Sequence, residues 1–309
     1  MTKIRSTDDS NMDDRRGEGG GGGGGFSIPG MGGGGGGFPI PGGMKAGGGI
    51  VGIVILLAVV LLPRLLGGSD GQGSLQPVSD TAASSGSGAA SGSACVTDLE
   101  QTVCGVTNDV QRYWKSALPK YFGVDYQQTK TRLFDAPRQT GCGQASPETG
   151  PFYCPADALV YIDLGFMQQI EQQLVGDTSD LAEQYILAHE YGHHVQNLLG
   201  TNEQVQRASR SDPSRANQYS VALELQADCY AGAWVGDANA RGLLDSPDEI
   251  QEAIKAAEGV GDDRIQQKTT GRIDPERWTH GSAEQRRTWF LKGFTSLDPR
   301  QCDTFKEIL

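Results

Sequence analysis

The six-residue run His189-Glu190-Tyr191-Gly192-His193-His194 constrains this chain more than any other feature of its sequence. Its first five residues match the pattern H-E-x-x-H, and the run holds three of the four histidines. Because side chains four residues apart share one face of a helix, His189 and His193 can offer two imidazole nitrogens to one tetrahedral zinc ion. Glu190 would lie beside them, where its carboxylate can take a proton from a zinc-bound water.

The third zinc ligand has to come from outside this run, because a catalytic zinc takes three protein ligands and keeps one position for water. The pattern H-E-x-x-H-x-x-G-x-x-H fails here, since residues 196 and 199 are glutamine and leucine. A later carboxylate is the other route. Glu224 and Asp228 lie four residues apart in an otherwise apolar run, so they face the same way. We expect Glu224 to bind the metal and Asp228 to accept a hydrogen bond from a ligand histidine.

The two remaining histidines have different expected roles. His194 points about 100° around the helix from His193 and cannot share its metal-binding face, so we interpret it as a structural residue. His280 precedes a helix start and is our candidate for the donor that stabilises a developing oxyanion; a surface or capping role is the alternative. Weaker candidates for the same donor role are Tyr191, Tyr230 and Arg287.

The start of the chain has the composition of a disordered tail followed by a membrane anchor. Polyglycine runs cannot bury enough apolar surface to offset the entropy of ordering, so we expect residues 1–45 to be a disordered Gly-rich tail. Residues 46–66 hold the one strongly apolar stretch, with 17 uncharged residues before Pro63. We predict a single transmembrane anchor there, with a buried helix or a signal-peptide core as alternatives. Residues 67–94 are rich in Gly, Ser and Ala, as a flexible linker would be.

All six cysteines follow the apolar stretch. An even number on one side suits an oxidising compartment, so we expect a single-pass protein of the inner membrane with its catalytic domain extracytoplasmic or periplasmic. Spacing favours a Cys142–Cys154 disulfide, and Cys95–Cys104 and Cys229–Cys302 are the remaining guesses.

Acidic residues outnumber basic ones by 38 to 26, and the formal net charge is −12. A negative chain without a basic cluster is poorly suited to binding nucleic acid, which attracts proteins through its phosphates. Nucleic-acid binding is therefore excluded from the expected functions.

Helix signals dominate residues 95–309. Residues 158–164 are predicted to form a strand, and a helix running to about Leu199 carries the H-E-x-x-H run, with Gly200 as its stop. Further helices are expected at about 109–118, 214–234, 247–258 and 282–293. The sequence thus predicts an α+β fold for residues 95–309, mainly helical, with a small sheet preceding the H-E-x-x-H helix.

Several segments of this chain resemble the bacterial putative neutral zinc metallopeptidase family. They are Gly141-Cys-Gly, Gly150-Pro-Phe-Tyr-Cys-Pro155, Val160-Tyr-Ile-Asp163, His189 to Gln196, Glu224 to Gly232, and His280-Gly-Ser with Gln285-Arg286. The resemblance covers about residues 95–305 and implies a gluzincin-like zincin fold in a membrane-anchored bacterial protein. It implies that His189, His193 and Glu224 bind zinc and that Glu190 is catalytic. It implies little about the substrate.

The combined prediction is a membrane-anchored zinc-dependent endopeptidase with one zinc ion per chain. It would hydrolyse peptide bonds through a zinc-bound water with Glu190 as general base. The expected partners are a peptide or protein substrate, which could add as a strand to an edge at residues 160–164, and the membrane through one helix. One alternative is a non-catalytic membrane-anchored zinc-binding or scaffolding module, which does not need Glu190. The other is a helical domain with chance histidines. The oligomeric state and the substrate stay open.

Overall fold

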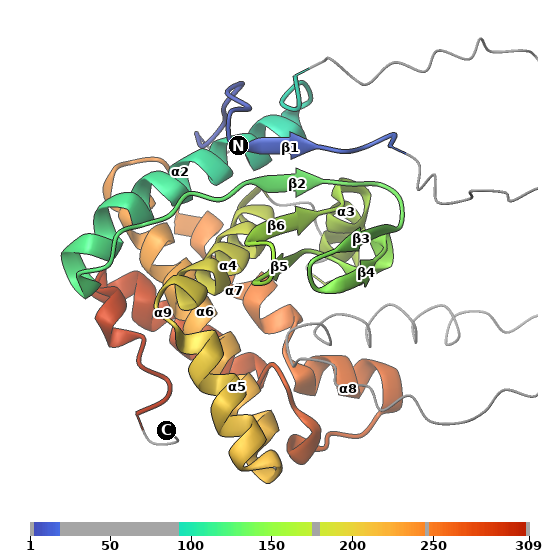
Figure 1. Cartoon of the computed structure of the whole chain (residues 1–309), viewed down its shortest axis with the longest axis vertical. Coiled ribbons are helices and arrows are strands. Elements are labelled where there is room, and N and C mark those ends of the chain that lie inside the picture. Colours follow the sequence, from blue (N-terminus) through green and yellow to red (C-terminus); the bar gives the residue numbers. More distant parts are fainter. Residues whose placement is uncertain (1–2, 19–92, 175–179, 245–246, 307–309) are drawn as a thin grey trace, which may run out of the picture.

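The computed structural model describes residues 3–18, 93–174, 180–244 and 247–306, in which helices surround one side of a small sheet (Figure 1). The predicted anchor at residues 46–66 and nearly all of the predicted linker lie outside these ranges. Among the described helices, none combines the length and the apolar character that a membrane crossing requires.

Eight α-helices are described. Their bounds are α2 Asp98–Phe122, α3 Leu164–Leu174, α4 Asp180–Leu198, α5 Thr201–Ser211, α6 Ala216–Ala240, α7 Pro247–Gly259, α8 Asp262–Thr270 and α9 Ala283–Ser296. Thr97 and Ser282 cap α2 and α9 through capping boxes. Four short 3-10 turns, Pro147–Thr149, Pro213–Arg215, Pro275–Arg277 and Pro299–Gln301, each begin with proline. The H-E-x-x-H helix is confirmed as α4. The sequence did not predict α3, α5 or α8.

The main sheet has the strand order β1-β2-β6-β5. Its strands are β1 Met12–Asp14, β2 Thr131–Leu133, β6 Leu159–Ile162 and β5 Phe152–Cys154, and a separate hairpin pairs β3 Arg138–Thr140 with β4 Gly143–Ala145. β1, β2 and β6 are parallel, whereas β5 is antiparallel to β6. The strand predicted at 158–164 is therefore β6, and it lies inside the sheet. The expected substrate edge on that strand is wrong, because β2 and β5 already occupy both of its sides.

The first strand also overturns the prediction that residues 1–45 are a disordered tail, as far as residues 3–18 are concerned. Ile4 and Met12 are buried in the main core, and Met12–Asp14 pairs with β2. The reason for the error is that the glycine runs dominate the composition of the whole segment. Before the glycines begin, a short stretch contains apolar residues that can be buried and charged residues that can form ion pairs, and the overall composition does not reveal it.

The structure contains three disulfides, and all three predicted pairs are confirmed. They are Cys95–Cys104, Cys142–Cys154 and Cys229–Cys302. The third ties α6 to the segment after α9. α6 and α9 also pack closely against each other, so the C-terminal part of the chain supports the helix that carries Glu224.

Candidate metal centre

The H-E-x-x-H helix α4 packs against α6, and this contact brings the three predicted ligands together. One ligand atom from each of His189, His193 and Glu224 lies within 4.8 Å of the other two. The reason α4 can approach so closely is Gly192: a Cβ atom there would lie 3.0 Å from the Cα of Ala227 on α6. One of the unspecified positions of the motif therefore sets the spacing between the two helices.

The ligand atoms have the distances and chemistry of a metal site. Nε2 of His189 lies 3.1 Å from Oε2 of Glu224, and Nε2 of His193 lies 3.5 Å from Oε1 of the same carboxylate. Two imidazole nitrogens and one carboxylate oxygen are a donor set that catalytic zinc sites use. We conclude that these residues fit a zinc ion.

His189 is oriented by a buried carboxylate, as predicted. Its Nδ1 donates to Oδ1 of Asp228 at 2.8 Å, which directs Nε2 toward Glu224. Asp228 is fully buried and is also bound by Arg286, which donates from Nε to Oδ2 and from Nη2 to Oδ1, both at 2.8 Å. The Tyr185 hydroxyl donates to Oδ1 at 2.5 Å. The charge of Asp228 is thus balanced by a buried guanidinium.

His193 is oriented by a residue that sequence reasoning did not assign. The side-chain amide of Gln196 donates to the carbonyl of Leu223 at 2.7 Å, which fixes the direction of that amide. Its Oε1 therefore accepts from Nδ1 of His193, at 2.8 Å. Both ligand histidines consequently present Nε2 to the metal position.

The histidines and carboxylates of the site shift one another's pKa values. Burial lowers the pKa of His189, but Asp228 and Glu224 outweigh it and raise that pKa to about 10. Burial likewise raises the pKa of Glu224, yet the neighbouring His193 and His189 hold it well below its usual range. A cation bound between His189 and Glu224 would compete with a proton for that imidazole.

Glu190 lies where a general base is required, between α4 and the edge strand β5. It is 6% exposed, and its Oε2 accepts a hydrogen bond from the backbone N–H of Tyr153 at 2.8 Å. Burial raises the pKa of Glu190, and the charges of His193 and His189 oppose that rise. A carboxylate with a raised pKa is a better proton acceptor near neutral pH than an exposed one.

The predicted structural role of His194 agrees with its contacts. Its Nε2 donates to the carbonyl of Gln127 at 2.7 Å, so Nδ1 must accept the hydroxyl proton of Tyr153, 3.0 Å away. Burial lowers the pKa of His194. It therefore ties α4 to β5 as a neutral ring and takes no part in the metal position.

His280 lies close enough to Glu224 to lower the pKa of that carboxylate. Its Nδ1 contacts Oδ1 of Asp262 at 3.1 Å, and its backbone N–H donates to Oδ2 at 2.6 Å. Its Nε2 is buried and has no partner among the described residues. Of the weaker candidates, Tyr191 and Tyr230 are buried and Arg287 pairs with Glu258.

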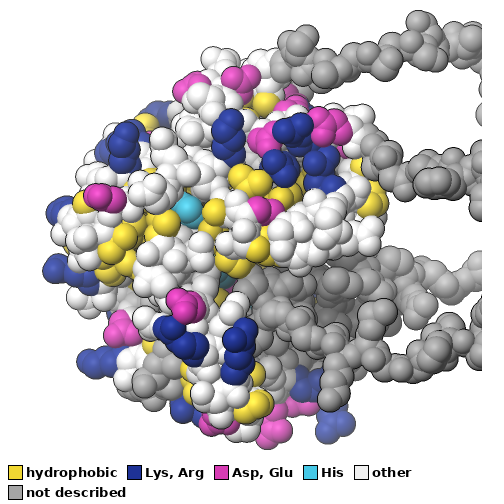
Figure 2. Space-filling view, in the orientation of Figure 1, with side chains coloured by type: hydrophobic (Ala, Val, Ile, Leu, Met, Phe, Trp, Pro, Cys, Tyr) yellow, Lys and Arg dark blue, Asp and Glu magenta, His cyan; other side chains and the backbone are white. Residues whose placement is uncertain are grey.

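The site thus contains four residues that the sequence did not identify: Tyr153, Tyr185, Gln196 and Arg286. Gln196 could have been noticed, because it follows His193 by three positions on the same helix. Tyr185 could have been noticed for the same kind of reason, because it precedes His189 by four positions on α4. Tyr153 and Arg286 come from other segments, β5 and α9. Figure 2 shows histidine on only a small part of this face, with hydrophobic side chains beside it, in accordance with the burial of the ligands.

Comparison with known proteins also points to a zinc-binding protein. The family described as "Putative neutral zinc metallopeptidase" matches residues 1–305. The Escherichia coli K12 "Uncharacterized protein YpfJ" is 46% identical over 184 residues, which are 59% of this chain and 63% of that protein. The "Uncharacterized protein Mb2605" of Mycobacterium bovis and the "Uncharacterized protein Rv2575" of Mycobacterium tuberculosis are each 47% identical over 207 residues, 64% of this chain and 68% of theirs. The chain therefore spans less than two thirds of the E. coli relative. No solved structure matches this chain. With the family match extending over nearly its whole length, the chain belongs to the putative neutral zinc metallopeptidase family.

Proposed function

We propose that this chain is a zinc-dependent endopeptidase that binds one zinc ion through His189, His193 and Glu224. The observation that carries the proposal is the convergence of these three ligands within 4.8 Å, with both histidines turned by hydrogen bonds so that Nε2 faces the same point. Zinc held there would polarise the scissile carbonyl and lower the pKa of a water molecule.

Glu190 is the proposed general base. Its raised pKa suits proton transfer near neutral pH, and its contact with Tyr153 of the edge strand β5 would put it beside a peptide bound along that strand. It would take the proton of the attacking water and then pass it to the leaving amine. The Tyr153 N–H holds one carboxylate oxygen, so the other oxygen is the one that would exchange protons.

His280 is the proposed donor to the oxyanion. Its Nδ1 and its backbone are held by Asp262, while its buried Nε2 lacks a partner within the described part of the chain. A buried polar atom without a partner is costly, and an oxyanion that develops nearby would supply one. Asp262 would keep the ring in position as the charge develops.

The substrate is proposed to bind as an extended strand along β5. Within the described sheet, β5 is paired only with β6, and its other side has no strand partner. Its residues Phe152–Cys154 lie next to Glu190, and the Cys142–Cys154 disulfide anchors its end. The Tyr153 N–H on this edge is bonded to Glu190, so a peptide would pair with the other backbone groups of the edge, regardless of its side chains.

The three disulfides support an extracytoplasmic location for the domain. That location is part of the proposal, and it suits a peptidase that acts on proteins outside the cytoplasm.

One experiment tests the activity. The full-length wild type and Glu190→Gln are compared for bound zinc by elemental analysis and for cleavage of unfolded casein. Glu203→Gln serves as the control, because it removes the same charge from an exposed residue of α5. We expect about one zinc in all three proteins, and a loss of about 10²–10⁴-fold in rate only for Glu190→Gln.

Other outcomes are equally informative. Equal rates for wild type and Glu190→Gln would refute the proposed base. Zinc in every protein without any cleavage would favour the scaffolding module, and the absence of zinc from folded wild type would refute the metal site.

A further inference from the structure

The N-terminal segment, residues 3–18, is built into the domain as a strand and not merely placed against it. β1 adds to β2 in parallel register, with Asp13 opposite Arg132. Backbone hydrogen bonds run from Thr131 N–H to the Asn11 carbonyl at 3.0 Å and from Arg15 N–H to the Leu133 carbonyl at 2.9 Å. Figure 1 shows this strand beside β2 with α2 next to it. The segment therefore completes the sheet.

Side chains hold the same segment in place. Ile4 and Met12 are 4% and 6% exposed and belong to the main hydrophobic core. Arg132 donates to Oδ2 of Asp13 at 2.5 and 2.8 Å, and Arg16 pairs with the buried Glu100 of α2. Apolar burial stabilises such a contact, and moving the segment away would leave the charges of Arg132 and Glu100 without these partners.

The surface of α2 is shaped for this segment. A Cβ atom at Gly105 would lie 2.7 Å from the Cα of Arg5 and from the carbonyl of Ile4, so only glycine admits the chain at this distance. Asn108 of α2 donates to the carbonyl of Asp8 at 2.9 Å, and it contacts the side chain of Asn11 at 2.7 Å. The helix thus carries a matching site for residues that lie about a hundred positions earlier.

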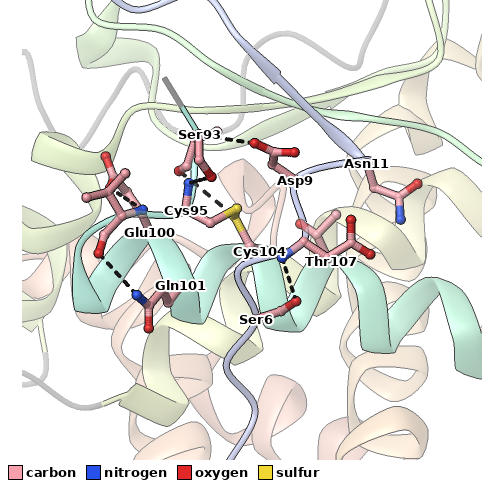
Figure 3. The surroundings of a disulfide bond; sticks show 12 residues. Ser6, Asp9, Asn11, Ser93, Cys95, Glu100, Gln101, Cys104 and Thr107 are labelled. Carbon is pink, nitrogen blue, oxygen red and sulfur yellow. Dashed lines mark hydrogen bonds between the residues drawn. A yellow bond between two sulfur atoms is a disulfide. The ribbon is translucent and has the colours of Figure 1, made fainter. Parts of the chain in front are cut away.

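The contact also includes a disulfide. Figure 3 shows the Cys95–Cys104 bond with Ser6, Asp9 and Asn11 of the segment around it. The N–H of Ala94, next to Cys95, donates to Oδ2 of Asp9 at 3.3 Å. Structural disulfides form and persist in oxidising compartments. The segment consequently lies against a bond that has to be made outside the cytoplasm.

We propose that residues 3–18 share the extracytoplasmic compartment with residues 93–306, as a permanent strand of the same domain. A chain that crossed a membrane once between residues 18 and 93 would separate these two parts. Two helical crossings need about 40 apolar residues, whereas the sequence between the two parts has one strongly apolar stretch, with 17 uncharged residues before Pro63. The described fold and a single-pass topology with the N-terminus inside are therefore mutually exclusive. The proposal does not depend on the peptidase activity.

Cross-linking in cells tests the contact in the full-length chain. Asp13→Cys with Arg132→Cys replaces an ion pair between register partners by two cysteines. Asp13→Cys with Arg207→Cys is the control, because Arg207 is exposed on α5 and pairs only with Glu203 in the described contacts. We expect an intramolecular disulfide between the peptides of residues 13 and 132, found by mass spectrometry without reductant, and none in the control. A disulfide-linked dimer, or no cross-link in a folded protein, would overturn the proposal.

Labelling distinguishes the compartments without disturbing the contact. Ser10→Cys and Arg207→Cys, each alone and both at exposed positions, are treated in intact bacterial spheroplasts with a membrane-impermeant maleimide. We expect equal labelling of both, and none of the wild type, whose six cysteines are paired. Labelling of Ser10→Cys only after lysis would overturn the proposal. Labelling of both only after lysis would overturn the extracytoplasmic location.

Discussion

Arg286 offers a sharp test of how the site is built, because it reaches the metal position only through other residues. It is 3% exposed and makes two hydrogen bonds of 2.8 Å to Asp228, and it donates to the Tyr185 hydroxyl at 3.1 Å. Asp228 in turn holds His189. Arg286→Met keeps most of the volume and removes the charge, which leaves the fully buried Asp228 without the guanidinium that binds both of its oxygens.

The magnitude follows from the geometry. Removing one partner of a buried ion pair costs about 3–5 kcal/mol, because the remaining charge stays buried without compensation. The hydrogen bonds give a similar figure, since two bonds to a charged group contribute about 1.5–3 kcal/mol each. A domain has about 5–15 kcal/mol of stability in total, so the variant should fold and be clearly weakened. Zinc affinity should fall by about 10–100-fold, as for other residues that orient a metal ligand.

The assay is urea unfolding without reductant, together with zinc titration, on the full-length wild type and two variants. Arg287→Met is the matched control. Arg287 is next to Arg286 in the sequence, its side chain is 49% exposed, and it forms an ion pair of 3.4 Å with Glu258. It should change stability by about 0–1 kcal/mol and leave zinc affinity unaltered. If Arg286→Met behaved like Arg287→Met in both measurements, the reasoning about the buried pair would be refuted.

Three further predictions concern other parts of the chain. Gly293→Ala should prevent stable folding, seen as loss of the cooperative unfolding transition, because its Cβ would lie 1.9 Å from the Cys229 carbonyl. Burial raises the pKa of Glu100, but the Thr97 N–H and Arg16 lower it to about 2 in the folded chain, against 4.5 unperturbed. Its contribution to stability is therefore complete above about pH 4.5 and is lost as the pH falls toward 2; a flatter acid-unfolding profile in Glu100→Gln would show this, and an unchanged profile would contradict it. His280→Gln should lower kcat by about 10²–10³-fold with zinc retained and KM little changed, and a pure KM effect would argue against an oxyanion donor.

The ligand set could be predicted because two local periodicities carry it. His189 and His193 lie on one face of α4, and Glu224 and Asp228 on one face of α6, so each pair is fixed by helical spacing alone. A capping-box pattern likewise placed the start of α9 at Ser282, whereas the helix predicted at 109–118 is only the later part of α2, which begins at Asp98. Local rules of this kind need no knowledge of which elements meet.

The parts that could not be predicted depend on contacts between distant segments. Arg286 lies 58 residues after Asp228, and a capping pattern says nothing about what its helix packs against. β1 is three residues long and pairs with a strand that begins at Thr131. Short parallel strands carry little sequence signal, because their pairing is decided by packing at both faces. The error about the substrate edge has the same origin, because the sequence of one strand does not predict which strands lie beside it.

The most direct test of the central claim is a zinc titration of the metal-free, full-length protein with peptide hydrolysis as the readout. The account predicts that activity rises in proportion to added zinc and stops at about one equivalent, and that His193→Ala, which lacks one ligand, shows no such rise. Activity in thoroughly chelated wild type, or a plateau that does not depend on His193, would contradict it.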